Sequence, residues 1–171
     1  MNNQTFDNFV QSESNKHALS VIDEIFTSIK YGSNLNPLVI CSKESNGKTH
    51  LLNAIKHKLE SEFPEKTVKY INPDLLRKEI TKHFIPNETA NRIINAIPRL
   101  NLFEYDFLLF DDFQKFPLRE KLLITLSKEF QKGLMKNQQL IITSTYVPQT
   151  YWAIMETMSN VFMKSALISI Y

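Results

Sequence analysis

The tripeptide Gly47-Lys48-Thr49 has the residue types, in the right order, to bind phosphate. It follows the apolar run Leu38–Cys41, so the stretch predicts a buried strand, a tight loop and a helix that begins at the tripeptide. Backbone N–H groups of such a loop face the β- and γ-phosphates of a nucleotide, and the helix N-terminus adds positive potential. Lys48 would reach the same phosphates, and the Thr49 hydroxyl would hold Mg²⁺.

The loop departs from the full pattern G-x-x-x-x-G-K-[ST]. Ser42 stands at the first glycine position, which leaves Gly47 as the one glycine of the loop. Glu44 also places a carboxylate near the phosphates, and like charges there reduce affinity. The alternative interpretation is a helix N-terminus that happens to carry Lys and Thr. The sequence therefore predicts nucleotide binding that is weak and depends on Mg²⁺.

A second candidate element is an apolar strand that ends in two carboxylates. The run Phe107–Phe110 is followed directly by Asp111 and Asp112. A nucleotide-hydrolysing site of this kind needs an acid on the strand beside the loop, because that acid orders Mg²⁺ and its waters. The alternative is a buried strand followed by a solvated turn. Together, the loop and the acid pair predict a site for ATP and Mg²⁺.

Strands and helices that alternate along the chain must position these residues. The expected strands cover residues 38–41, 67–71, 107–110, 140–144 and 166–170. The expected helices cover residues 15–31 after a cap at Ser14 or Asn15, 48–63, 72–80 with Asn72 as the cap, 90–100, 118–134 and 148–158. This alternation predicts a three-layer α/β fold, with a five-stranded parallel sheet and helices on both faces. The loop, the acid pair and Thr143-Ser144 all follow strands, so they should meet at one edge of the sheet.

The composition is that of an ordinary globular protein, and residues 1–171 suit a single domain. Hydrophobic residues make up 43% and charged residues 22%, and the formal net charge is only +2. That charge leaves no strong nucleic-acid footprint, so we expect no sequence-specific binding of duplex DNA. One cysteine, Cys41, fits a reducing compartment, and no apolar run approaches the roughly 18 residues needed to span a membrane. The expected location is cytoplasmic.

The order of these elements resembles the AAA+ ATPases, and above all the ATPase domain of the DnaA family of bacterial replication initiators. The likeness runs from about residue 5 to residue 168 and is carried by Thr5–Val10 with Ser14-Asn15, Asn36–Ile40, Gly47–Ile55, Leu108–Gln114, and Ile142–Ser144 with Pro148. In the family these stretches are the N-terminal box, the P-loop with its flanks, the Walker B strand and the sensor-1 strand. The resemblance implies a P-loop NTPase core.

The resemblance also implies a role for each candidate residue. Phe6, Asn8 and Phe9, in an N-terminal arm of residues 1–13, would flank the adenine; hydrophobic anchoring is the alternative. The phosphates would be held by Asn46, Gly47, Lys48 and Thr49, and Mg²⁺ by Thr49 and Asp111. His50 belongs to the same set of nucleotide-binding residues. Asp112 would position or activate water, while Thr143 or Ser144 would contact the γ-phosphate or that water.

The departures from the family bear on catalysis and on DNA. The family's arginine finger precedes a Phe; matched on Phe162, that position is Val161, and no arginine follows Arg119. The sequence to Tyr171 leaves no room for the family's helical lid or its DNA-reading helix-turn-helix domain. Single-stranded DNA contacts in the family come from the segment after the second strand. Here a weak contact of this kind, or a solvated helix face, would use Arg77, Lys78, Lys82 and Arg92.

The expected function is that of a DnaA-like ATP-binding protein in replication initiation or its control, acting through a replication initiator or a helicase protein. Without an arginine finger, the isolated chain should hydrolyse ATP negligibly, although the retained residues do not by themselves decide on turnover. One alternative is a non-enzymatic interaction protein that keeps the fold but not ATP. Two others are a helicase-loader-type ATPase and a remnant of a longer gene.

Overall fold

The structure, a computed structural model, describes residues 4–29, 35–43, 47–82, 95–116, 120–145, 161 and 165–170. Its centre is a five-stranded sheet in the order β2-β3-β4-β1-β5, and every neighbouring pair is parallel. The strands are β1 (Leu38–Cys41), β2 (Val68–Ile71), β3 (Phe107–Phe110), β4 (Gln139–Ser144) and β5 (Ala166–Ser169). The predicted five-stranded parallel sheet is therefore confirmed.

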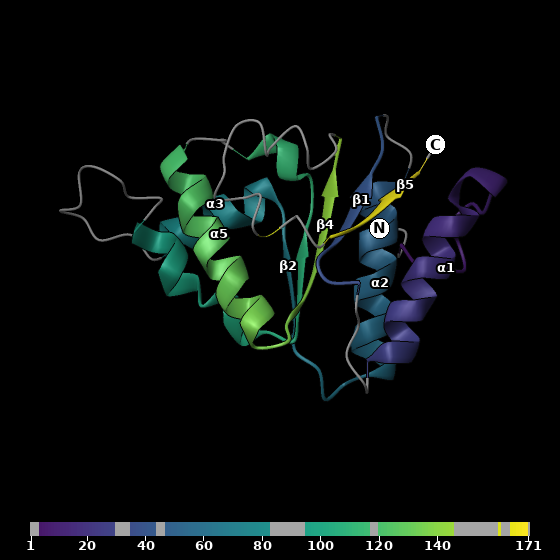
Figure 1. Ribbon diagram of the computed structural model, residues 1–171, viewed down its shortest axis with the longest axis horizontal. Helices are drawn as coiled ribbons and strands as arrows, with labels where there is room; N and C mark the ends of the chain where they lie inside the picture. The colour runs from purple at the N-terminus through teal and green to yellow at the C-terminus, as the bar shows by residue number, and fades with distance from the viewer. Residues whose placement is uncertain are drawn as a thin grey trace.

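Helices cover both faces of the sheet, which gives the three predicted layers (Figure 1). On one face lie α1 (Glu13–Ser28) and α2 (Lys48–Glu62), and on the other lie α3 (Pro73–Lys82) and α5 (Glu120–Met135). Short 3₁₀ segments η1 (Ile97–Leu100), η2 (Leu102–Glu104) and η3 (Phe113–Lys115) flank β3 on either side along the chain. Among the described helices, none is both long enough and apolar enough to cross a membrane.

Alternation along the buried strands divides the core into two clusters. Leu38 and Ile40 of β1 face α1 and α2, whereas Val39 of the same strand faces α3 and α5. The four residues of β1 and of β3 are all buried, as expected for strands covered on both faces. Each fully buried Leu, Ile or Phe side chain stabilises the fold by about 1.5–3 kcal/mol relative to exposure.

An aromatic cluster on the α5 face supports the carboxyl end of β3. The Phe110 ring centroid lies 4.6 Å from that of Phe116, 5.5 Å from that of Phe130 and 5.8 Å from that of Phe113. Such ring pairs add about 0.5–1.5 kcal/mol beyond the area they bury. Because Phe110 and Phe113 bracket the two acids in sequence, their packing fixes the turn that carries Asp111 and Asp112.

The sheet order adds one feature of the site that the sequence analysis left open. The strand β4 lies between the acid-bearing strand β3 and β1, the strand that leads into the loop. Thr143 and Ser144, at the end of β4, therefore stand between the loop and the acid pair. Hydrophobic patterning identifies strands but carries no information on their lateral order, so the sequence did not reveal this arrangement.

The helix starts were predicted with mixed success. Asn72 caps α3 as expected, because its Oδ1 accepts the Leu75 N–H at 2.8 Å. The prediction of a cap at Ser14 or Asn15 is wrong, since α1 begins at Glu13 and Ser12 is the cap residue. Asn15 instead reaches back from inside the helix, where its Oδ1 accepts the Ser12 N–H at 2.9 Å.

Three predicted features fall wholly or partly outside the described residues. They are the end of the first helix at residues 30–34, most of the helix at residues 90–100 and the helix at residues 148–158. Of the second, the described part ends in η1, where Pro98 stands near the start of a tighter 3₁₀ turn. The helix expected from residue 118 is described from Glu120 onward.

Candidate functional site

The junction between the loop and α2 is built on Gly47. This residue has φ 83°, in the left-handed region, and it is the N-cap of α2. A Cβ atom at this position would lie 2.9 Å from Cε2 of Phe9, so both conformation and space require glycine. The loop leaves β1 at Ser42, whose N–H donates to the carbonyl of Ser144 at 3.2 Å. Asn46, predicted to contact phosphate, lies outside the described residues.

Lys48 occupies the first position of α2 with its side chain turned across the loop. Its Nζ donates to the carbonyl oxygen of Ser42 at 3.0 Å, and the residue is only 7% exposed. Burial lowers the pKa of Lys48 below its ordinary value, while the charges of Asp112 and Asp111 oppose that change. A partly desolvated ammonium group at a helix N-terminus is well placed to receive an anionic ligand.

Thr49 and His50 complete the first turn of α2 in different ways. Thr49 is exposed, so its hydroxyl is accessible to a cation beside the loop. His50 is tied to the N-terminal arm: its Nε2 lies 2.9 Å from the carbonyl oxygen of Thr5, and its ring centroid lies 5.2 Å from that of Phe9. His50 therefore holds the arm against the helix, and its predicted part in nucleotide binding stays a prediction.

The three arm residues predicted to flank adenine have separate surroundings. Phe9 is 8% exposed and packs against Gly47 and His50, so it lies at the loop junction. Phe6 packs instead on α1, with its ring centroid 6.1 Å from that of Phe26. Asn8 is exposed, and its Oδ1 accepts the Thr5 N–H at 2.9 Å. Phe9 thus combines anchoring with nearness to the loop, whereas Phe6 anchors the arm.

Asp111 is buried, and each of its carboxylate oxygens receives a hydroxyl donor. The Tyr70 hydroxyl of β2 donates to Oδ2 at 2.7 Å, and the Thr143 hydroxyl of β4 donates to Oδ1. Burial and the neighbouring Asp111 carboxylate raise the pKa of Tyr70, so its hydroxyl remains a donor. A carboxylate has about four acceptor positions, so these two bonds leave Asp111 able to bind a hydrated cation.

Asp112 occupies a left-handed turn at φ 52°, as the N-cap residue of η3. Its Oδ1 accepts Gln114 Nε2 at 2.8 Å, and its Oδ2 lies 2.6 Å from Lys115 Nζ. Burial alone would raise the pKa of Asp112, but the hydrogen bonds from Lys115 and Gln114 outweigh it and hold that pKa below its ordinary value. Asp112 is therefore ionised and paired.

Thr143 joins the two acids into one unit. Besides donating to Asp111, its Oγ1 accepts the backbone N–H of Asp112 at 2.9 Å. Ser144 is also fully buried and connects β4 to the start of the loop through its carbonyl group. The predicted contact of Thr143 or Ser144 with a γ-phosphate remains a prediction, since the Thr143 hydroxyl has a clear structural task of its own.

The structure adds three residues to which the sequence analysis assigned no role: Tyr70, Gln114 and Lys115. In the parallel register, Tyr70 pairs with Leu109, two residues before Asp111, so a tyrosine near the end of an adjacent strand was the available signal. Gln114 Oε1 also accepts the Thr145 N–H at 3.1 Å, which links the acid turn to the end of β4. The side-chain partners of Gln114 and Lys115 depend on the turn geometry at Asp112.

The structure describes part of two further predicted features, the position matched to the arginine finger and the basic residues after the second strand. Val161, matched to the arginine-finger position, is 1% exposed and belongs to the apolar cluster under α5, while its neighbour Phe162 lies outside the described residues. Arg77, Lys78 and Lys82 are all exposed along α3, which suits either a solvated face or a weak contact with nucleic acid. Arg92 lies outside the described residues.

The donor set fits a nucleotide-bound Mg²⁺ better than a free metal site. Among the described residues, no group of three or more His, Cys, Asp or Glu side chains could hold a metal ion. Mg²⁺ is commonly bound through one or two carboxylates together with substrate phosphates, and Asp111 with Thr49 matches that requirement. Lys48, the N-terminus of α2 and the acid pair thus supply the chemistry for a triphosphate and its cation.

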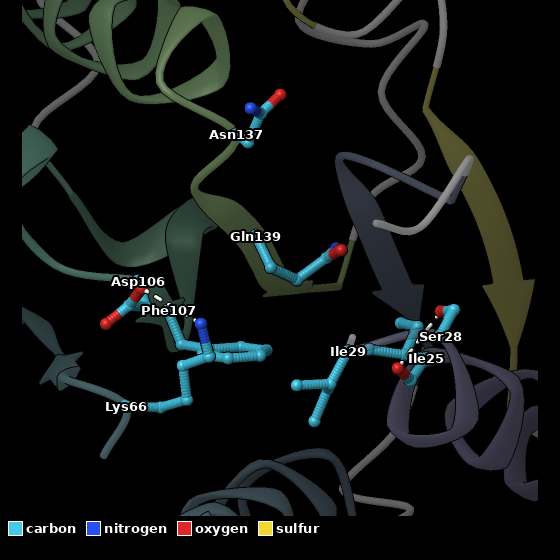
Figure 2. Close-up of a pocket in the computed structure, with 8 residues that line it drawn as sticks. All are labelled: Ile25, Ser28, Ile29, Lys66, Asp106, Phe107, Asn137 and Gln139. Atoms are coloured by element: carbon cyan, nitrogen blue, oxygen red, sulfur yellow. Dashed lines mark hydrogen bonds and ion pairs between the residues drawn. The ribbon is translucent and has the colours of Figure 1, made fainter. Parts of the chain in front are cut away.

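A small pocket elsewhere on the molecule is separate from this site. Figure 2 shows it between α1 and the starts of β3 and β4, with Ile25, Asp106 and Gln139 among its lining residues. It therefore lies at the amino ends of the strands, whereas the loop, the acid pair and Thr143 lie at their carboxyl ends. Ligands of open parallel sheets bind at the carboxyl ends, so we take the edge that carries Lys48 and Asp111 as the candidate site.

Comparison with known proteins gives a consistent result. The family model of the bacterial DnaA ATPase domain matches residues 1–168. The chromosomal replication initiator protein DnaA of Spiroplasma citri is 34% identical over 147 residues, which cover 85% of this chain and 31% of that protein. The chain thus spans about a third of the length of the curated relatives it matches.

Solved structures show the same core. AMPPCP-bound DnaA from Aquifex aeolicus is similar with a TM-score of 0.77 and 26% identity, over 99% of this chain and 50% of that chain. A DnaC helicase loader is similar with a TM-score of 0.70 and 16% identity, over 99% of this chain and 97% of that chain; this second likeness shows the fold alone. The predicted family resemblance and P-loop fold are confirmed, and no lid-forming helices occur among the described residues.

Proposed function

The chain belongs to the bacterial DnaA ATPase domain family, and from this premise we propose that it is an ATP-binding AAA+ module that acts in replication initiation or its control. We propose that it binds ATP with Mg²⁺ weakly, turns it over slowly, and works through contacts with a replication initiator or a helicase protein. A weak contact between the exposed cations of α3 and single-stranded DNA is part of the same proposal.

The observation that carries this proposal is the meeting of three elements at one sheet edge. Lys48 lies at the N-terminus of α2 and donates to the Ser42 carbonyl, Asp111 and Asp112 directly follow β3, and Thr143 on the intervening strand bonds both acids. A structural role alone does not require a nearly buried lysine whose ammonium group donates to a loop carbonyl. The same arrangement supplies what a nucleoside triphosphate and its metal ion need.

Each residue has a defined task in this proposal. Gly47 lets the backbone turn into α2, Lys48 exchanges the Ser42 carbonyl for phosphate oxygens, and the Thr49 hydroxyl with Asp111 receives Mg²⁺. The bound cation would neutralise charge on the phosphates. Tyr70 and Thr143 keep the Asp111 carboxylate in one orientation through their hydroxyl donors. Phe9 would close the site at the arm, beside Gly47.

Slow turnover follows from the cations available at the site. Charge on the transferred phosphoryl group increases in the transition state, and an arginine finger contributes roughly 10³–10⁵ in rate. The sequence has no arginine after Arg119, and Val161 at the matched position is an apolar residue in the core. Within residues 1–171, Lys48 would then be the side-chain cation predicted at the phosphates, together with Mg²⁺, and no arginine at the matched position would add to them.

An origin-unwinding reaction reconstituted with a complete DnaA initiator tests the proposed role. Purified chain added with Mg-ATP should change the extent of unwinding in proportion to its concentration. Lys48→Ala should abolish this effect, whereas Lys56→Ala, on the same helix and with a half-exposed ion pair to Glu60, should not. No effect of the wild-type chain would contradict a role in initiation.

The main alternative is a protein that keeps the fold and acts without nucleotide. In the unwinding reaction, an equal effect of the wild-type chain and Lys48→Ala would support this alternative against ATP binding. The likeness to the helicase loader concerns the fold alone and does not favour a loading activity. An effect that requires both Lys48 and ATP would favour the proposal.

A further inference from the structure

Lys115 is a charged group at the site that neither the phosphate-binding set nor the magnesium set uses. It lies at the end of η3, three residues after Asp112, and its side chain is 64% exposed. Its ammonium group nevertheless lies 2.6 Å from Oδ2 of Asp112, whose side chain is only 24% exposed. The ion pair therefore forms at the rim of the site and points inward to the acid predicted to act on water.

The Lys115 ion pair is one of several contacts that hold Asp112. Gln114 donates to the other carboxylate oxygen at 2.8 Å, and Thr143 accepts the backbone N–H at 2.9 Å. Each carboxylate oxygen thus already accepts one donor from the chain itself, which leaves a second acceptor position on each oxygen. A carboxylate that must orient a water molecule needs an acceptor position directed at that water.

We propose that Lys115 is a positioning residue that restrains turnover by holding the Asp112 carboxylate in an ion pair, away from the water it would activate. This inference rests on the proposed function, because turnover requires bound ATP. In hydrolysis the water oxygen bonds to the γ-phosphorus, the bond to the β-phosphate oxygen breaks, and Asp112 accepts the proton of the water. An ammonium group that donates to Oδ2 occupies one of the acceptor positions that a hydrogen of the water would otherwise use.

The opposite role for Lys115 is also chemically defined, and the sign of one measurement separates the two. The side chain is long and largely exposed, so its charge could move to the transferred phosphoryl group in place of an arginine. If it restrains Asp112, neutralising Lys115 raises the rate; if it supplies charge, neutralising Lys115 lowers the rate. The closed ion pair with a half-buried acid is the arrangement that the structure contains, and it favours restraint.

The test compares Lys115→Met with Lys115→Arg, which keeps the charge, and with Lys16→Met. Lys16 is a matched control because it forms an exposed ion pair with Glu13 at the same three-residue spacing, on α1. ATP affinity is measured by calorimetry, and hydrolysis is measured as phosphate release in a single turnover. Lys115→Met should release phosphate about fivefold faster or more, well within the ~10²–10⁴ range of acid–base catalysis, with the ATP Kd unchanged within about twofold. Lys115→Arg and Lys16→Met should match the wild type.

A second readout uses the protein without nucleotide. A double-mutant cycle of Lys115→Met and Asp112→Asn, followed by urea unfolding, should show that the two changes are not additive. The corresponding cycle of Lys16→Met and Glu13→Gln should be additive within error, because both side chains of that ion pair are largely exposed. Additivity at Lys115 and Asp112 would show that the pair does not persist in solution and would overturn the inference.

The outcomes separate this inference from the proposed function. If the folded wild type and Lys115→Met both fail to bind ATP, the proposed function is wrong and the inference fails with it. If both bind ATP and Lys115→Met hydrolyses it no faster, the inference alone is wrong. A slower Lys115→Met would assign Lys115 to charge stabilisation instead.

Discussion

Replacing Thr143 with Val tests whether one hydroxyl joins the two acids. Valine has nearly the same shape, so the change removes the donor to Asp111 and the acceptor for the Asp112 N–H with little effect on packing. A hydrogen bond to a charged group contributes about 1.5–3 kcal/mol, and one to a neutral N–H about 1 kcal/mol. An added buried methyl group returns about 0.8 kcal/mol. The expected net loss of unfolding free energy is about 2–3 kcal/mol.

Urea unfolding followed by circular dichroism measures this loss, with two further variants for comparison. Thr81→Val is the matched control, because the Thr81 hydroxyl donates only to the Arg77 carbonyl on the exposed α3 helix, and it should change stability by less than about 0.5 kcal/mol. Thr143→Ser keeps the hydroxyl and should retain most of the ATP affinity that Thr143→Val loses. A Thr143→Val protein as stable as the wild type would refute the assignment of Thr143 as the bridge between the acids.

Three further predictions concern the remainder of the fold. Gly133→Ala should lower the unfolding free energy by about 1–2 kcal/mol, although alanine inside a helix is normally about 1 kcal/mol more favourable than glycine. The reason is that the new Cβ would lie 2.8 Å from Gln138 Cδ and displace a side-chain amide that donates to two backbone carbonyls. An unfolding midpoint that rises would contradict this. Burial raises the pKa of Cys41 to about 11, so a thiol reagent at about pH 8 should label the folded protein slowly and the urea-unfolded protein quickly. Equal labelling rates would show that Cys41 is accessible. Burial alone would raise the pKa of Asp106, but two hydrogen bonds from Thr67 hold that pKa below its ordinary value. The ionised Asp106 carboxylate therefore stabilises the folded protein above about pH 4, and this contribution is lost as the pH falls. The unfolding free energy should therefore fall less between about pH 6 and about pH 3 in Asp106→Asn than in the wild type. An equal fall in both proteins would refute this.

The sequence predicted the strands and the site edge because those features are local. Apolar runs such as Phe107–Phe110 are short, bounded and fully buried in the structure, and the residues after them are polar. In parallel strands those polar residues must share one edge, whatever the order of the strands. The described ends of the loop, the acid pair and Thr143 accordingly lie at one edge of the sheet.

Contacts that depend on lateral order and turn conformation could not be predicted in the same way. The bridge from Thr143 to both acids requires β4 to lie between β3 and β1, which hydrophobic patterning does not encode. The Lys115 ion pair requires a left-handed turn at Asp112, and a non-glycine residue seldom adopts that conformation.

The N-terminal arm illustrates a third kind of limit. Phe6 and Phe9 occur in one short segment, and composition alone does not show which ring faces the loop. A turn in which the Phe9 N–H donates to the Phe6 carbonyl at 3.3 Å separates the rings, sending Phe9 to Gly47 and Phe6 to Phe26. The alternative of hydrophobic anchoring, weighed for the whole arm, thus describes Phe6 well.

Calorimetric titration of the folded chain with ATP in the presence of Mg²⁺ tests the central claim most directly. The arrangement of Lys48, Asp111 and the N-terminus of α2 predicts saturable heat with a Kd between about 10 µM and about 1 mM, which corresponds to a binding free energy of roughly 4–7 kcal/mol. The heat should disappear with a chelator or with Lys48→Ala and persist with Lys56→Ala. No heat at millimolar Mg-ATP, from protein whose circular dichroism spectrum shows that it is folded, would contradict ATP binding by this site.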